Sequence, residues 1–142
     1  MPTQSRKIFI DSSVLLSFID RSDQNHSKGI KSIESIAELK FQAYTSHQNV
    51  SEAYTTLVGE VGISVALDFL QAILQSDIEI IYPQKTDLVS AYRLLRTNRD
   101  RQIGLQEVLN ASLMRKKGIT QVLTFAIWHN LFGTYVSNLA GS

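Results

Sequence analysis

Short apolar runs alternate along the chain with longer segments in which apolar side chains recur every three or four residues. The short runs lack strict apolar–polar alternation, which is typical of strands covered on both faces. They predict strands at residues 8–10, 41–45, 78–82 and 121–125, and a short fifth strand at residues 134–136. The longer segments predict helices at residues 14–19, 27–39, 50–61, 63–74, 85–98 and 105–117.

The order of these elements predicts the fold class. The segment 50–61 has the clearest helical pattern, because its apolar side chains form one continuous stripe. Pro83 ends the third strand, and Gly118 stops the last helix at a C′ position. Strands separated by helices predict a three-layer α/β/α sandwich around a parallel sheet of four to five strands. Ligands in such folds bind outside the carboxyl ends of the strands.

Composition narrows the class of protein. The 142 residues, of which 44% are hydrophobic, predict a single domain spanning residues 1–142. A net charge of +1 favours neither bulk attraction to nucleic acid nor an acidic tail. The absence of cysteine excludes disulfides and thiolate metal sites. Residues 1–11 lack the apolar region of a signal peptide and no apolar run suits a membrane span, so we expect a soluble, cytoplasmic protein.

Two acids lie close behind predicted strands. Asp11 directly follows the first strand, where it is either the N-cap of the next helix or a carboxylate at the functional edge of the sheet. Glu52 lies near the start of the helix at residues 50–61, roughly opposite its apolar stripe. Glu52 is therefore either a solvated glutamate, favoured by the helix dipole, or a second member of a site.

Glu107 opens the helix at residues 105–117, which is apolar around most of its circumference. A helix of this kind is usually buried, and a buried carboxylate needs a partner, either a basic side chain or a metal ion. Asp11, Glu52 and Glu107 can converge at one end of the sheet. Their mutual repulsion favours a hard divalent cation such as Mg²⁺ or Mn²⁺.

Three segments together give the chain a family resemblance. They are KIFIDSSVLLSFID, TSHQNVSEAYTTL and GLQEVLNASLMRKKGITQVLTF. In order, spacing and total length they resemble the PIN-domain family, and specifically its VapC-type ribonuclease toxins, over residues 7 to about 136. The resemblance implies an α/β/α fold and hydrolysis of RNA phosphodiesters with Mg²⁺ or Mn²⁺ held by three or four acids. It also implies a cognate antitoxin protein and a homodimer as partners.

The resemblance assigns the acids by position. Asp11 matches the first acid and Glu52 the second, while Glu107 stands where the family usually has aspartate. Ala126 occupies the position of the fourth acid, so this position has no carboxylate. The alanine is either a natural degeneration or an aspartate changed deliberately to make a toxic nuclease tolerable to its host. Two hydroxyl residues match those that support the metal site, Ser13 and Thr124.

Several other residues allow two interpretations. Arg99 and Arg101 are candidates for contacts with RNA phosphates, whereas Arg93 and Arg96 fit a solvated positive surface. The basic run at residues 115–117 fits the last turn of a helix. The three histidines show no metal-ligand spacing, and the predicted site needs none. Trp128, Leu131 and Phe132 are interpreted as side chains that pack in the core or at the edge of the sheet. Candidates for the homodimer or antitoxin contact are Ile30, Ile33 and Ile36.

Two functional hypotheses follow. The first is an endoribonuclease toxin that depends on Mg²⁺ or Mn²⁺, with Asp11, Glu52 and Glu107 as metal ligands and with activity impaired by Ala126. The second is a catalytically degenerate PIN-fold module that binds RNA or a protein.

Overall fold

A computed structural model describes residues 6–139, which contain one five-stranded parallel sheet. The strands follow the order β3-β2-β1-β4-β5. Their bounds are β1 Lys7–Ile10, β2 Gln42–Ser46, β3 Glu79–Ile81, β4 Gln121–Leu123 and β5 Tyr135–Val136. Phe9 pairs with Tyr44 on one side and with Val122 on the other, so β1 lies at the centre of the sheet. Residues 1–5 and 140–142 of the expected domain lie outside the described residues.

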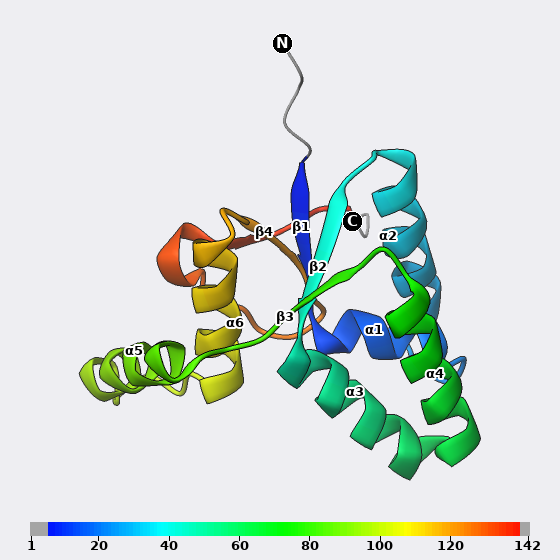
Figure 1. The fold of residues 1–142 in the computed structure, drawn as a ribbon, viewed down its shortest axis with the longest axis horizontal. Helices are drawn as coiled ribbons and strands as arrows, with labels where there is room; N and C mark the ends of the chain where they lie inside the picture. The colour runs from blue at the N-terminus through cyan, green and yellow to red at the C-terminus, as the bar shows by residue number, and fades with distance from the viewer. Residues whose placement is uncertain (1–5, 140–142) are drawn as a thin grey trace.

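Helices cover both faces of this sheet (Figure 1). Four of them pack on one face, namely α1 Ser12–Ile19, α2 His26–Glu38, α3 His47–Glu60 and α4 Ile63–Gln75. The other face is covered by α6 Leu105–Lys116, against which α5 Lys85–Thr97 packs, and by the 3₁₀-helix η1 Leu131–Gly133. The predicted three-layer α/β/α sandwich is confirmed.

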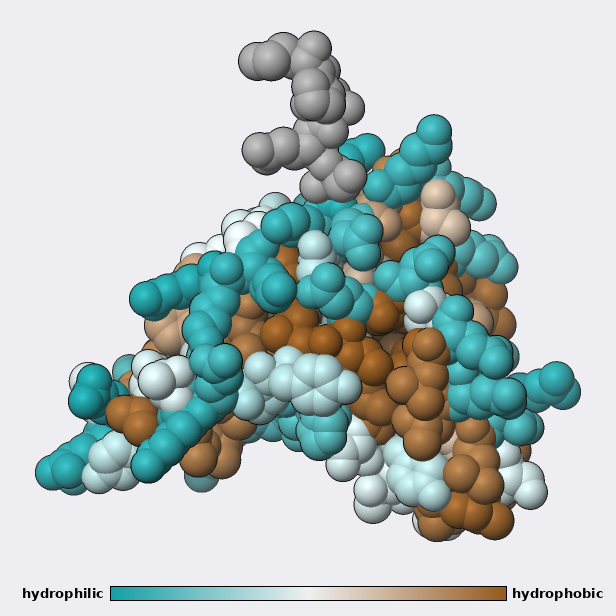
Figure 2. All heavy atoms as spheres, viewed as in Figure 1, coloured by the Kyte–Doolittle hydropathy of each residue, from teal (hydrophilic) through white to brown (hydrophobic). Residues whose placement is uncertain are grey.

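The side chains of β1 alternate between two apolar clusters. Ile8 and Ile10 point into the cluster beneath α1–α4, whereas Phe9 points into the cluster that contains Leu113 and Met114 of α6. This alternation follows from the pleat of a strand, and it lets one short apolar run supply both halves of the core. Figure 2 shows hydrophobic residues across the middle of one face, over the β3 edge of the sheet, with hydrophilic residues around them.

Several element boundaries differ from the prediction for local reasons. β4 ends at Leu123, because the N–H of Phe125 donates to the Ser13 hydroxyl at 2.9 Å instead of continuing the sheet. α3 begins at His47, three residues before the predicted start, because Ser46 caps it by accepting the N–H of Asn49 at 3.2 Å. The pattern of apolar residues along the chain does not predict side-chain hydrogen bonds of this kind.

The end of α6 confirms the C′ position of Gly118. This glycine has a φ of +69°, and its N–H donates to the carbonyl of Arg115 at 3.2 Å. The N–H of Ile119 donates to the carbonyl of Met114 at 2.8 Å, which completes a Schellman motif. No helix within residues 6–139 has the length and apolar character that a bilayer crossing requires.

Candidate functional site

The three predicted acids line one cavity of about 330 Å³. Asp11 lies between β1 and α1, Glu52 lies in the second turn of α3, and Glu107 lies in the first turn of α6. Ala126, just beyond the end of β4, lines the same cavity. The carboxyl ends of parallel strands meet at one edge of a sheet, and the helices that follow β1 and β2 start there. The three acids therefore line the same cavity at the carboxyl edge of the sheet.

Asp11 is held by hydroxyl groups. Asp11 is only 8% exposed. Its Oδ2 accepts hydrogen bonds from Thr124 Oγ1 at 2.7 Å and from Ser13 Oγ at 3.0 Å. Asp11 stands at the N-cap position of α1, as one of the two interpretations predicted, and its backbone carbonyl accepts the N–H of Leu15 at 3.2 Å. Its carboxylate, however, accepts no bond from the first N–H groups of α1 and faces the cavity instead. Ser13 and Thr124, the two hydroxyl residues predicted to support a metal site, thus both contact the carboxylate of Asp11.

Glu52 lies at the exposed side of α3 and still reaches the cavity. Its Oε2 accepts a hydrogen bond from Ser12 Oγ at 3.2 Å and another from Gln106 Nε2. The first bond connects Glu52 to the residue after Asp11, and the second connects it to α6. Its position off the apolar stripe is confirmed, and its carboxylate faces the candidate site rather than open solvent alone.

Glu107 has a basic partner. Its side chain is 13% exposed, and Oε1 lies 2.8 Å from Nδ1 of His129 while Oε2 accepts the backbone N–H of His129 at 2.6 Å. Of the two partners predicted for this buried carboxylate, the structure contains the basic side chain. Sequence reasoning assigned no histidine to the site and so missed this contact. The sequence carried one signal for this pair, which was the need of a buried carboxylate for a hydrogen-bonding partner.

A buried amide network beneath the cavity joins α3 to α6. Asn110 is 1% exposed, and its Oδ1 accepts hydrogen bonds from Ser46 Oγ and Gln48 Nε2, each at 2.7 Å. Its Nδ2 donates to Asn49 Oδ1 at 3.0 Å, and Gln106 Nε2 donates to the same oxygen at 3.2 Å. Sequence reasoning missed this network. A polar residue on the buried side of α6 was the available signal.

Ala126 supplies no ligand atom from its side chain. Its backbone N–H donates to Thr124 Oγ1 at 3.0 Å, which fixes the turn after β4. Within residues 6–139, no three histidine, aspartate or glutamate side chains come together closely enough to hold a metal ion. The candidate ligand atoms in the cavity are carboxylate oxygens, the type of ligand that Mg²⁺ and Mn²⁺ prefer. The hydrogen bonds of Asp11 and Glu52 involve one oxygen each, Oδ2 and Oε2, whereas both oxygens of Glu107 are bonded to His129. Binding of one cation by all three carboxylates therefore requires their side chains to move closer together.

The remaining predicted residues differ in how close they lie to the acids. Arg99 and Arg101 are exposed in the loop between α5 and α6 and do not line the cavity, so their contact with RNA stays a prediction. Trp128 packs as expected, with Nε1 donating to Thr134 Oγ1 at 3.1 Å, and it also forms one wall of the cavity. Ile36 is buried in the core, so it is not a surface for a partner, and Ile33 packs against the same cluster.

Solved bacterial proteins share this fold. VapC20 of Mycobacterium tuberculosis, described as a sarcin-ricin loop cleaving toxin, superposes with a TM-score of 0.72 at 20% identity, covering 84% of this chain and 89% of VapC20. VapBC2 from Rickettsia felis was solved with a DNA fragment from its promoter. It superposes with a TM-score of 0.69 at 16% identity, and the match covers 92% of this chain and 97% of the VapBC2 chain. FitAcB from Neisseria gonorrhoeae superposes with a TM-score of 0.67 at 15% identity, and the match covers 95% of this chain and 99% of the FitAcB chain.

These comparisons establish the architecture. No protein-family model and no curated protein matches the sequence. The three structures are at most 20% identical to this chain, and the likeness is therefore one of fold. The chain has a PIN-domain fold of the VapC type.

Proposed function

We propose that this PIN-fold chain is a metal-dependent endoribonuclease, the toxin of a toxin–antitoxin pair, with activity impaired by Ala126. The observation that carries the proposal is the meeting of Asp11, Glu52 and Glu107, from three different elements, on one cavity at the carboxyl edge of the sheet. VapC20, which shares the fold, is described as an RNA-loop cleaving toxin, and this supports RNA as the substrate class.

The chain's own residues account for the roles in this proposal. Asp11, Glu52 and Glu107 would hold Mg²⁺ or Mn²⁺, which supplies Lewis-acid chemistry for phosphodiester hydrolysis when bound. Thr124 and Ser13 orient the carboxylate of Asp11. We expect the lost carboxylate at position 126 to weaken cation binding more than folding, because Ala126 is exposed and no core packing depends on it.

The partners and the compartment form part of the same proposal. We expect a cognate antitoxin protein, a homodimer and a cytoplasmic location, in which RNA is accessible. The VapBC2 structure, a complex bound to promoter DNA, supports the expectation of an antitoxin for a chain with this fold. Arg99 and Arg101 remain candidates for contacts with RNA phosphates, since both are exposed.

A second candidate function is a binding module with a silent metal site. It is favoured by two observations, the methyl group of Ala126 at the cavity and the engagement of Glu107 by His129. The first removes a carboxylate from the cavity, and the second engages both oxygens of Glu107 in hydrogen bonds within the protein. In this case the fold would bind RNA or a protein without cutting it.

Ala126→Asp tests the assignment of the cavity. We expect a fourth carboxylate to strengthen Mn²⁺ binding about tenfold, equivalent to about 1.4 kcal/mol, measured by isothermal titration calorimetry. Cleavage of RNA in Mn²⁺ should rise in parallel. Asp11→Asn is the matched loss of a carboxylate, and it should abolish both the binding gain and the cleavage when combined with Ala126→Asp.

The outcomes separate the two candidates. Cleavage by the unmodified chain that disappears in Asp11→Asn supports the nuclease. RNA binding without cleavage, in both the unmodified chain and Ala126→Asp, supports the binding module. Unchanged Mn²⁺ affinity in Ala126→Asp would contradict the placement of the fourth acid at this position.

A further inference from the structure

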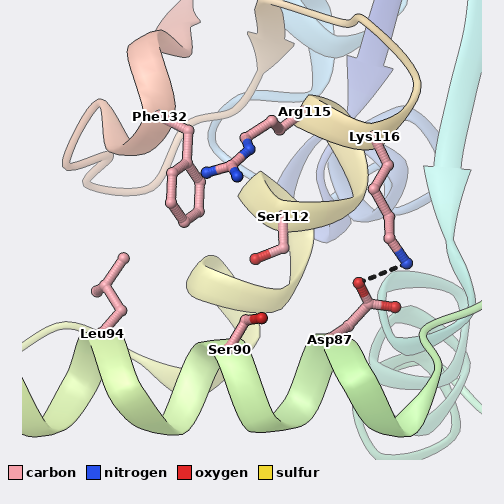
Figure 3. A pocket seen from close by; sticks show the side chains of 7 residues that line it. All are labelled: Asp87, Ser90, Leu94, Ser112, Arg115, Lys116 and Phe132. Carbon is pink, nitrogen blue, oxygen red and sulfur yellow. Dashed lines mark ion pairs between the residues drawn. The ribbon is translucent and has the colours of Figure 1, made fainter.

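A second pocket, of about 210 Å³, lies between α5 and α6 (Figure 3). This pocket and the acidic cavity lie on opposite sides of α6. The pocket is lined by Ser112, Arg115 and Lys116 of this helix, whereas the cavity is lined by Glu107 and Asn110. The wall on the far side comes from α5 and η1 (Figure 3). Nothing in the proposed nuclease chemistry uses this pocket.

Ser112 has a buried hydroxyl without a partner. The residue is 9% exposed, and Oγ forms no hydrogen bond, not even with the carbonyl one turn earlier that a helical serine commonly uses. Figure 3 shows this hydroxyl pointing into the space between α5 and α6, with the Ser90 hydroxyl on the opposite wall. A buried hydroxyl left unpaired destabilises a protein, so a ligand that accepts its hydrogen bond is favoured here.

The charges of the pocket leave one cation uncompensated. Lys116 Nζ lies 2.8 Å from Asp87 Oδ1, and Asp87 Oδ2 accepts the backbone N–H of Gln84 at 2.7 Å. Burial alone would raise the pKa of Asp87, but the hydrogen bond from Lys116, the bond from Gln84 and the attraction of the Lys116 charge together lower this pKa. Asp87 and Lys116 therefore cancel at neutral pH.

Arg115 carries the remaining charge. Its guanidinium lies over the ring of Phe132, 4.8 Å from the centroid, and it forms no ion pair with any residue in the described part of the chain. The aromatic ring holds the guanidinium at the pocket while its N–H groups remain available. Arginine, with donors in a planar fork, suits the oxygens of a phosphate group.

We propose that the pocket between α5 and α6 is a phosphate-ester site, in which Arg115 and the hydroxyls of Ser112 and Ser90 donate to the phosphate oxygens. Leu94 and Phe132 provide an apolar wall for the sugar or base of a nucleotide. A free nucleotide and a phosphodiester in an RNA strand present the same chemistry to these donors. The site is independent of the metal chemistry at the acidic cavity.

Calorimetric titrations in EDTA test this proposal on the full chain, because EDTA removes any phosphate binding through a metal ion. The probes are inorganic phosphate, adenosine monophosphate and a short single-stranded RNA without terminal phosphates. We expect saturable binding of at least one nucleotide probe with a Kd of about 1 mM or tighter. Arg115→Gln should weaken it about tenfold, and Ser112→Ala should weaken it by several-fold.

Two controls separate binding from folding. Arg21→Gln removes an exposed arginine on the other side of the sheet and should leave the affinity unchanged. Ser112→Ala should not lower the melting temperature, because its hydroxyl has no partner in the folded protein. Adenosine monophosphate binding without RNA binding identifies a free nucleotide as the ligand, and the reverse identifies a phosphodiester; either supports the site. The absence of saturable binding, or equal affinity in Arg115→Gln and the unmodified chain, would overturn it.

Discussion

The two pockets on opposite sides of α6 differ in charge and in how their polar groups are satisfied. The cavity at the N-terminal half of the helix contains Asp11, Glu52 and Glu107, and each carboxylate accepts hydrogen bonds from the protein. The pocket at the C-terminal half contains Arg115, which has no described ion pair, and Ser112, whose hydroxyl is unpaired.

The helix itself explains part of this division. Glu107 stands in the first turn of α6, whereas Arg115 and Lys116 stand in the last turn. The helix dipole favours negative groups at the first position and positive groups at the last. Both charge distributions therefore stabilise the helix, and charge alone does not identify a ligand site. The difference in hydrogen bonding is more informative, because a donor left unpaired indicates a missing acceptor.

Asn110→Ala should produce the largest loss of stability, on the side of α6 that faces the cavity. The substitution removes a buried amide and leaves Asn49 Oδ1 and Gln48 Nε2 with one partner fewer each. We expect the free energy of unfolding to fall by about 3 kcal/mol, measured by urea denaturation. Gln71→Ala, at an exposed position of α4, is the control and should change it by less than about 0.5 kcal/mol. A similar small change for Asn110→Ala would show that the network contributes little.

Asp87→Asn should have an intermediate effect, on the opposite side of the helix. Loss of the charged bond to Lys116 should lower the free energy of unfolding by about 2 kcal/mol at pH 7. Because the pKa of Asp87 lies below its ordinary value of 3.8, its contribution is complete above that pH and is lost as the pH falls through the lowered pKa.

The difference between the unmodified chain and Asp87→Asn should therefore shrink on acidification. Denaturation curves of the two proteins at a series of pH values measure it directly, and the other carboxylates cancel in the comparison. A difference that stays constant from neutral to acidic pH would assign the loss to packing rather than to charge.

Glu52→Gln should have the smallest effect on stability. Glu52 is exposed and lies off the apolar stripe of α3, and glutamine retains an oxygen that accepts the hydrogen bond from Ser12. We expect the free energy of unfolding to change by less than about 0.5 kcal/mol, measured by thermal denaturation. A drop of several degrees in the melting temperature would instead indicate that Glu52 is a structural link between α1, α3 and α6.

The apolar pattern predicted the architecture because the strands are short continuous apolar runs and the helices carry apolar side chains every three or four residues. The stripe beginning at Val50 predicted α3, and the run at residues 8–10 predicted the central strand, whose alternating side chains supply both halves of the core. The boundaries moved where side chains bonded to the backbone. Ser46 extended α3 at its start, and Ser13 took the N–H that would have continued β4.

By itself, the sequence determined the layers, the parallel sheet and the convergence of three acids, because these follow from periodicity and from the geometry of parallel strands. Only the tertiary structure decided which groups those acids contact. His129 lies 22 residues beyond Glu107 and reaches it through the loop after β4, while Ser112 and Ser90 face each other because α5 packs on α6. Such pairings depend on which elements pack together in space, and no local pattern in the sequence records them.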